Sequence, residues 1–127
     1  MPSIVISENG AFLGSIKTAD FNSTADQAIP VNAGRYIIRR IVVNNASVNL
    51  TTAAGGVYTA TAKGGTAVVA AAQVYAALTA AGKFADLTLA AVVGTDILTA
   101  ATLYLSLTVA QGSAATADVY IFGDALP

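Results

Sequence analysis

A glycine-rich stretch with a lysine near its end is the part of the sequence that could hold a phosphate. Residues 55–66 read GGVYTATAKGGT. A phosphate-binding loop needs the order G-x-x-x-x-G-K-[ST], with a strand before it and a helix after it, so that backbone N–H groups surround the phosphates. Here Lys63 precedes Gly64 and Gly65, and the residues between the glycine pairs alternate as in a strand. We therefore interpret this stretch as two turns flanking one strand, with glycine supplying positive φ angles.

The acidic residues give no catalytic pattern. A glycosidase needs two carboxylates that face each other across a cleft, and no spacing in this sequence indicates such a pair. Most of the aspartates are expected at turns or strand ends, where Asp bonds its own backbone. The seven carboxylates are Glu8, Asp20, Asp26, Asp86, Asp96, Asp118 and Asp124.

Cysteine and histidine are both absent from the chain. Their absence excludes a disulfide, a thiolate nucleophile, a Cys/His metal site and a Ser-His-Asp triad. No calcium loop of the D-x-[DN]-x-[DN]-G type occurs either. We expect a protein that is not an enzyme and that carries no cofactor and no metal.

Charge is sparse along the whole sequence. Charged residues make up 10% of the chain, against about 25% in an average soluble domain. A folded monomer of this mass exposes about 6,200 Å², so the six basic and seven acidic residues give one charge per about 480 Å². Hydrophobic residues are 55% of the chain, many of them alanine. Such a surface is typical of a subunit that other proteins partly cover.

Neither a nucleic acid nor a membrane is an expected partner. The only basic cluster is Arg35, Arg39 and Arg40, which is too small for a nucleic-acid footprint. The longest apolar stretch, 66–82, contains Gln73 and falls short of the about 20 apolar residues that a bilayer span needs. The first residues, MPSIVISENG, lack the basic and apolar regions of a secretory signal.

Short apolar segments alternate with turn residues from end to end, which is typical of an all-β sandwich or barrel. The clearest strand is 102–109, where Leu103, Leu105, Leu107 and Val109 point one way. Tyr104 therefore points to the outer face. In a second strand, 117–123, the outward positions are Tyr120 and Phe122, and the inward ones are Val119 and Ile121.

The segment 35–45 is rich in β-branched residues and apolar on both faces. Strict alternation puts Tyr36, Ile38 and Val42 on one face. The other face then carries Arg35, Ile37, Arg39, Ile41 and Val43. We expect this strand to face the sandwich interior on one side and a neighbouring subunit on the other, with Arg35, Arg39 and Ile41 at the interface.

Four further strands are expected at 83–90, 57–62, 26–31 and 96–100. The segment 67–82 is ambiguous, because its alanines and a stripe at helical spacing favour a helix while its neighbours are all β. We favour a strand followed by a loop, with a short helical turn near 74–78. The expected fold is all-β, a single-domain antiparallel β-sandwich covering residues 25–127.

Residues 1–24 show little periodicity, and we expect them to form an extended N-terminal arm. A free arm seldom keeps apolar side chains without a surface to meet. The arm is therefore expected to contact a partner through Ile4, Ile6, Phe12 and Leu13.

Exposed tyrosines allow two interpretations. Tyrosine rings on a sheet can stack on sugars, as in a carbohydrate-binding module. Tyrosine is also enriched at protein interfaces. Because charge is so sparse, we favour the interface role for Tyr104 and Tyr120.

Three stretches together resemble a known family: VNLTTAAGG (48–56), DLTLAA (86–91) and TLYLSLTVAQGSAATADVYIFGD (102–124). They are similar to small proteins of tailed-bacteriophage structural modules, in particular the capsid decoration, or cement, proteins with a β-sandwich or jelly-roll fold. The resemblance covers roughly residues 25–127, and it lies in pattern and composition, with no signature residues to carry over.

The resemblance implies a virion protein on the exterior of an icosahedral capsid, made in the bacterial host cytoplasm. Its implied partners are the major capsid protein, whose adjacent subunits it braces, and itself, as a homodimer or homotrimer. The alternatives are a carbohydrate-binding or receptor-recognition module of a phage fibre, and another head or tail structural subunit.

Overall fold

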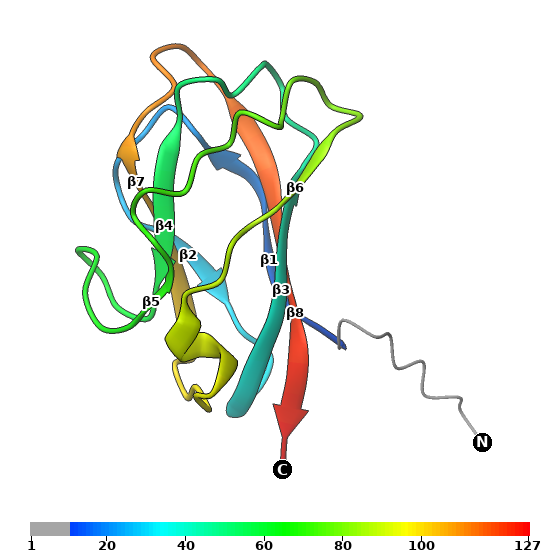
Figure 1. Cartoon of the computed structure of the whole chain (residues 1–127), viewed down its shortest axis with the longest axis vertical. Coiled ribbons are helices and arrows are strands. Elements are labelled where there is room, and N and C mark those ends of the chain that lie inside the picture. Colours follow the sequence, from blue (N-terminus) through cyan, green and yellow to red (C-terminus); the bar gives the residue numbers. More distant parts are fainter. Residues whose placement is uncertain (1–10) are drawn as a thin grey trace.

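The computed structural model describes residues 11–127, in which eight strands form two antiparallel four-stranded sheets (Figure 1). The sheet orders are β1-β8-β3-β6 and β2-β7-β4-β5, and we call them the first and the second sheet. The all-β, two-sheet architecture expected from the sequence is thus confirmed. The elements are β1 (Ala11–Asp20), β2 (Gln27–Pro30), β3 (Arg35–Asn44), β4 (Ala54–Tyr58), β5 (Ala67–Val69), β6 (Phe84–Asp86), the 3₁₀ turn η1 (Ala91–Gly94), β7 (Thr102–Val109) and β8 (Thr116–Leu126).

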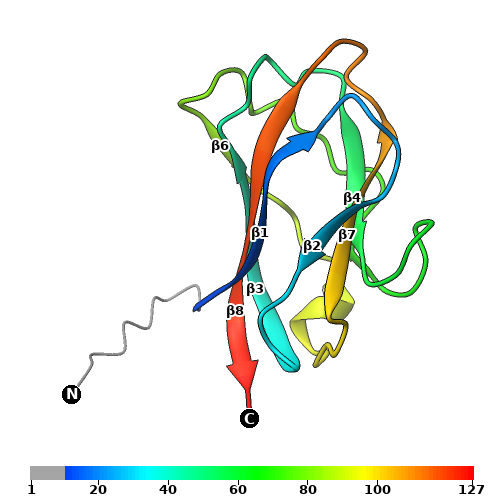
Figure 2. The same ribbon diagram turned by 180° about the vertical axis from the view of Figure 1, so that it is seen from behind.

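The core lies between the two sheets. Seen from behind in Figure 2, β1 runs along β8 and β2 runs along β7, so that the first and last halves of the chain interleave. The alternation predicted for β7 and β8 holds over most of their length: Leu103, Leu105 and Leu107 are buried, as are Val119 and Ile121. Val109 departs from the pattern, being 45% exposed at the end of β7.

A β-bulge in β3 corrects the prediction for that strand. Ile38 pairs with Gly123 and Arg40 pairs with Phe122, so one extra residue is inserted between them. Such an insertion reverses the inward and outward positions that follow it. Ile41 is consequently fully buried, and Val42 lies on the outer face. The expectation that Ile41 lies at an interface is wrong.

The N-terminal arm is also corrected over its described part. Residues 11–20 are β1, which pairs along its length with β8. Leu13 is 2% exposed and belongs to the core, so it is not available to a partner. Two register shifts, between Phe12 and Gly14 and between Ile16 and Ala19, interrupt the alternation of β1. They explain why its sequence lacks the period of a strand. Ile4 and Ile6 lie outside the described residues.

The two glycine pairs have different roles. Gly64 and Gly65 lie in the β4–β5 loop, where Gly65 has φ +66°, and this pair turns the chain as predicted. Gly55 and Gly56 instead lie inside β4, which begins before the predicted strand. A Cβ on Gly56 would come within 2.0 Å of the carbonyl oxygen of Val69. This pair is needed for close approach of backbones rather than for a turn.

The ambiguous segment 67–82 is a short strand followed by a loop, as favoured. After β5 the chain folds back on β4, with Val74 bridged to Ala54. The buried Tyr75 donates a hydrogen bond from its hydroxyl to the Gly55 carbonyl at 3.0 Å. Of the other expected strands, 26–31 is confirmed as β2, whereas 83–90 shrinks to β6 and 96–100 keeps a single bridge, at Leu98.

Candidate functional site

The outer face of the first sheet carries a cluster of large apolar side chains that no described part of the chain covers. Each strand of this sheet contributes to it: Phe12 comes from β1, Tyr120 and Phe122 from β8, Val42 from β3 and Phe84 from β6. The strand register brings them together, since Phe12 pairs with Phe122 and Val42 with Tyr120. Phe84 and Phe12 are 57% and 51% exposed. We call these five residues the aromatic face.

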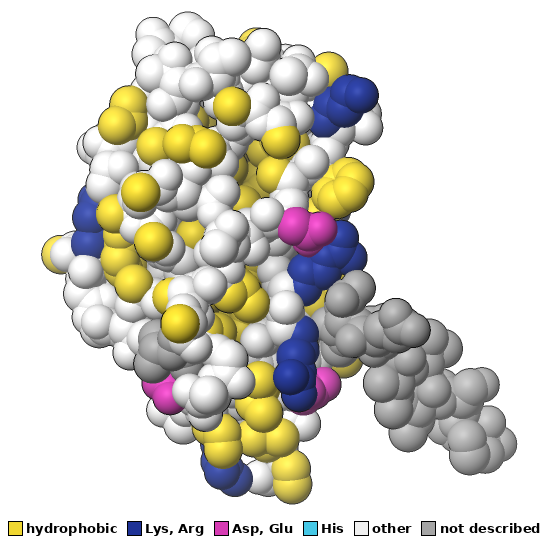
Figure 3. All heavy atoms as spheres, in the orientation of Figure 1, with side chains coloured by type: hydrophobic (Ala, Val, Ile, Leu, Met, Phe, Trp, Pro, Cys, Tyr) yellow, Lys and Arg dark blue, Asp and Glu magenta, His cyan; other side chains and the backbone are white. Residues whose placement is uncertain are grey.

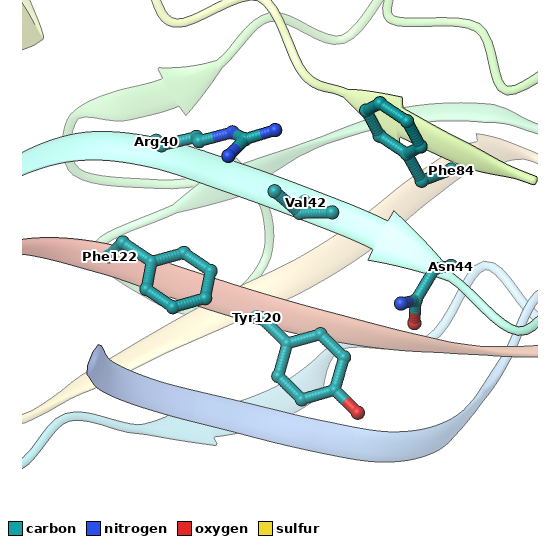
Figure 4. A pocket seen from close by; sticks show the side chains of 6 residues that line it. All are labelled: Arg40, Val42, Asn44, Phe84, Tyr120 and Phe122. Carbon is teal, nitrogen blue, oxygen red and sulfur yellow. The ribbon is translucent and has the colours of Figure 1, made fainter. Parts of the chain in front are cut away.

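A shallow open hollow of about 420 Å³ lies in this face (Figure 4). In the close-up, the rings of Phe122 and Tyr120 stand side by side on β8, and Phe84 lies beyond β3. The ring of Phe12 continues the cluster, because it meets Phe122 edge to face with centroids 6.1 Å apart. The hollow is lined by Arg40, Val42, Asn44, Phe84, Tyr120 and Phe122.

Charged groups of both signs surround the apolar centre. Arg40 forms a bidentate ion pair with Asp86 across β3 and β6, in which Nη2 and Oδ2 are 3.0 Å apart. The carboxylate of Asp86 raises the pKa of Arg40. Arg39 pairs with Asp124 at 2.9 Å. The side chains of both pairs are exposed to solvent, which weakens their attraction, so their charges remain available to a partner.

Lys17 extends over the aromatic face from β1. Its Nζ lies 5.2 Å from the ring centroid of Tyr120, within the range of a cation–π contact. Tyr120 also raises the pKa of Lys17. The lysine therefore stays protonated and adds a positive charge at the β1 side of the face.

The structure brings together some of the predicted interface residues and separates others. Phe12, Arg39 and Tyr120 lie on the outer face of the first sheet. Arg35 lies at the end of the same sheet, where it donates a hydrogen bond to the Pro127 carbonyl at 3.1 Å. Tyr104 is on β7 of the second sheet, beside a separate hollow.

Several residues of the aromatic face were not predicted, although the sequence carried a signal for some of them. Phe122 alternates with Ile121, so its outward position was visible beside that of Tyr120. Phe84 likewise precedes the inward-facing Ala85. Val42 was predicted on the same face as Tyr36 and Ile38, which is wrong, because the bulge in β3 leaves no mark in the hydrophobic pattern.

Lys63, the lysine of the glycine-rich stretch, has a structural role. Its Nζ donates a hydrogen bond to Ser106 Oγ at 3.0 Å, and Ser106 is fully buried on β7. The neighbouring Ala62 N–H donates to Asp26 Oδ2 at 2.8 Å, and this bond lowers the pKa of Asp26. The loop is thus tied to the second sheet by its polar groups, and its N–H groups at Ala62, Gly64 and Thr66 already donate within the protein.

Residues 11–127 show no sign of two further classes of site. In that range no group of three or more Asp, Glu, His or Cys side chains could hold a metal ion. The same residues contain no helix long and apolar enough to cross a membrane.

The chain was also compared with known proteins. No protein-family model, no curated protein and no solved structure matches it. The chemistry of the aromatic face is therefore the basis for assigning a function.

Proposed function

We propose that this chain is a structural protein of a tailed-bacteriophage virion, which binds the exterior of the icosahedral capsid and braces adjacent subunits of the major capsid protein. The observation that carries this proposal is the aromatic face, an apolar centre with a charged rim left open on one sheet, which marks the chain as a subunit of a larger assembly. An apolar centre inside a polar rim is the usual anatomy of a protein interface. The capsid as the partner comes from the family resemblance of the sequence.

We further propose a jelly-roll fold, as in the decoration proteins that the sequence resembles. The strand pairing supports it: β1 pairs with β8, β2 with β7, β3 with β6 and β4 with β5, all antiparallel. This is the pairing of one long hairpin rolled into two sheets, which is how an eight-stranded jelly roll is built.

Decoration would stabilise the shell by mass action. A protein that binds only the assembled junction between capsid subunits adds its binding free energy to the assembled state at every copy. Weak contacts suffice when one unit touches several subunits at once. A chain of this kind needs no catalytic group, in keeping with a non-enzymatic role.

Binding to shells tests the proposal. The fluorescently labelled protein is mixed with expanded shells assembled from the major capsid protein encoded by the same phage genome, and bound protein is separated by sedimentation. We expect saturable binding at a fixed number of copies per shell, together with a higher melting temperature of the decorated shell. A concentration of about 100 µM is high enough to detect even the weak affinity of a transient complex. If neither saturable binding nor a thermal shift occurs up to that concentration, the proposal is overturned.

A carbohydrate-binding or receptor-recognition module is the second candidate, and the same hollow favours it. The rings of Tyr120 and Phe84 could receive the apolar C–H face of a sugar, while Arg40, Asp86 and Asn44 offer hydrogen-bonding groups beside them. Titration calorimetry against a panel of bacterial surface oligosaccharides distinguishes the two. Measurable sugar affinity that Tyr120→Ala abolishes would favour this candidate over the capsid role.

A further inference from the structure

We infer that the aromatic face is the self-association surface of this protein, on which a second copy of the chain packs face to face across a two-fold axis. The inference rests on the proposed function only in treating the chain as an assembly subunit. It adds which surface is used and which partner covers it.

The apolar content of the face argues for a protein partner. Phe12 and Phe84 each expose more than half of their surface to water, although they are large hydrophobic side chains. With Val42, Tyr120 and Phe122 they form one contiguous patch that spans all four strands of the first sheet. Covering such a patch removes apolar surface from water, which stabilises a complex by about 25 cal/mol per Å² before the costs of association are subtracted.

The charges argue for a second copy as that partner. Near the patch lie the cations Lys17, Arg39 and Arg40 and the anions Asp86 and Asp124. In a two-fold dimer both copies use the same surface, so each of these charges on one copy faces these same charges on the other copy. A face with only one sign would repel its own copy. Because this face carries both signs in nearly equal number, arginine and aspartate can exchange partners between copies.

The size of the face is adequate for a dimer. The three long strands of the first sheet have 10, 10 and 11 residues. At about 3.3 Å per residue and 4.8 Å between strands, they cover roughly 500 Å² in projection. Protruding side chains increase the accessible area above this projection, toward the about 800 Å² per partner of a standard interface. The area therefore fits a specific dimer.

Dimerisation through this face leaves another apolar surface uncovered. Segment 70–82 follows β5 and bonds to β4 of the second sheet, as in the hydrogen bond from the Gly55 N–H to the Gln73 carbonyl at 2.9 Å. No charged residue occurs between Lys63 and Lys83. In Figure 3 the middle of the front face is accordingly white and yellow, whereas charged side chains gather along the edge that carries β3 and β6. A dimer could thus present two such surfaces to a shell.

The test is the native mass of the full chain and of three variants. Light scattering after size exclusion, and sedimentation velocity up to about 200 µM, measure the monomer–dimer equilibrium. We expect the wild type to reach about 25 kDa, twice the chain mass of 12.7 kDa. Phe84→Glu and Phe12→Glu are expected to weaken the dimer at least about tenfold, because each places a charge at the apolar centre. Val109→Glu, at an apolar position of the second sheet that is 45% exposed, is the matched control and leaves the dimer intact.

Each outcome decides the inference. A wild type that stays monomeric, a trimer, or a dimer that both Phe→Glu variants leave unchanged would overturn it. A deletion of residues 1–10 that converts a monomeric wild type into a dimer would assign the face to that segment instead. Circular dichroism and melting temperature verify that the variants fold, which is expected because both phenylalanines are more than half exposed.

The shell-binding assay keeps this inference separate from the capsid role. A monomer that decorates shells would overturn self-association alone. If the wild type is a dimer that Phe84→Glu disrupts, but the wild type binds no shell, self-association is supported and the capsid role is not.

Discussion

The ammonium group of Lys63 donates a hydrogen bond to the hydroxyl of Ser106, with Nζ and Oγ 3.0 Å apart. Through this bond the loop after β4 is held against β7, and the buried hydroxyl of Ser106, which also bonds the Asp26 carboxylate, gains a further partner. The backbone of Lys63 has φ +57°, a left-handed conformation that costs a non-glycine residue about 1–2 kcal/mol. The contact therefore has to compensate for local strain.

Replacing Lys63 separates these two effects. Lys63→Ala removes the hydrogen bond and keeps the strain, so we expect it to lower the free energy of unfolding by about 1 kcal/mol. Lys63→Gly removes both and should be less destabilising than Lys63→Ala, because glycine adopts positive φ at no cost. Urea unfolding of the two variants and the wild type measures the difference. Equal stability of Lys63→Ala and wild type would show that the bond contributes nothing.

Gly56→Ala is expected to be strongly destabilising. The added Cβ would lie 2.0 Å from the Val69 carbonyl oxygen and 2.9 Å from Ala70 backbone atoms, and neither can move without opening the β4–β5 pair. We expect a loss of about 2 kcal/mol or more, as for other substitutions that force backbone shifts in a core. Gly34→Ala is the control, since no atom beyond its two chain neighbours would lie within 4 Å of the added Cβ. A shift in denaturation midpoint of similar size for both would contradict this explanation.

Alkaline pH should destabilise the fold through Tyr36. Burial raises the pKa of Tyr36 to about 12, above its ordinary value of about 10. The unfolded chain therefore loses the proton between pH 10 and 12 while the folded chain retains it, and stability falls as the pH rises through this range. The loss attributable to Tyr36 is on the order of 2 to 3 kcal/mol by pH 12. Burial of Tyr75 acts in the same direction.

Tyr36→Phe provides the check on this pH dependence. The variant loses the hydrogen bond from the hydroxyl to the Ala100 carbonyl, 2.7 Å long, and is less stable at pH 7. Its stability should then decline less steeply above pH 10, as measured by urea unfolding at a series of pH values. An unchanged slope would assign the alkaline decline to other groups.

Asp118→Ala should loosen the junction between β1 and β3. The buried carboxylate accepts from the Thr18 N–H at 2.8 Å and from Asn45 Nδ2 at 3.2 Å. Both donors belong to residues with positive φ, so one side chain fixes two left-handed positions. We expect a loss of about 1–3 kcal/mol, with faster hydrogen exchange at Thr18. Asp118→Asn keeps an acceptor and should cost less; a larger loss for Asn than for Ala would contradict this role.

The sequence predicted the fold class because strands β7 and β8 alternate between core and surface over most of their length. Those strands are long, and their side chains Leu105 and Ile121 are fully buried in the expected direction. Where the backbone departs from strict alternation, prediction failed. The bulge after Ile38 moved Ile41 into the core, and the shifts in β1 hid a strand that was read as an arm.

The candidate site was predictable only in part for the same reason. Tyr120 and Arg39 were correctly predicted on the outer surface. Phe84 was not predicted to join them, because the pairing that sets Phe84 beside Asn44 joins strands about 40 residues apart in sequence. No local pattern encodes that register. Tyr104 was assigned to the same interface group as Tyr120, although the two tyrosines belong to different sheets.

The position of β8 between β1 and β3 has a consequence for synthesis in the cell. While β8 is still inside the ribosome, β1 and β3 have already emerged, but β8, the strand to which both form hydrogen bonds, is missing. The first sheet can therefore close only after β8 has emerged, and until then two strands about ten residues long present unpaired edges. Such a nascent chain would be prone to aggregation, and a premature stop before Thr116 would leave that vulnerability permanent.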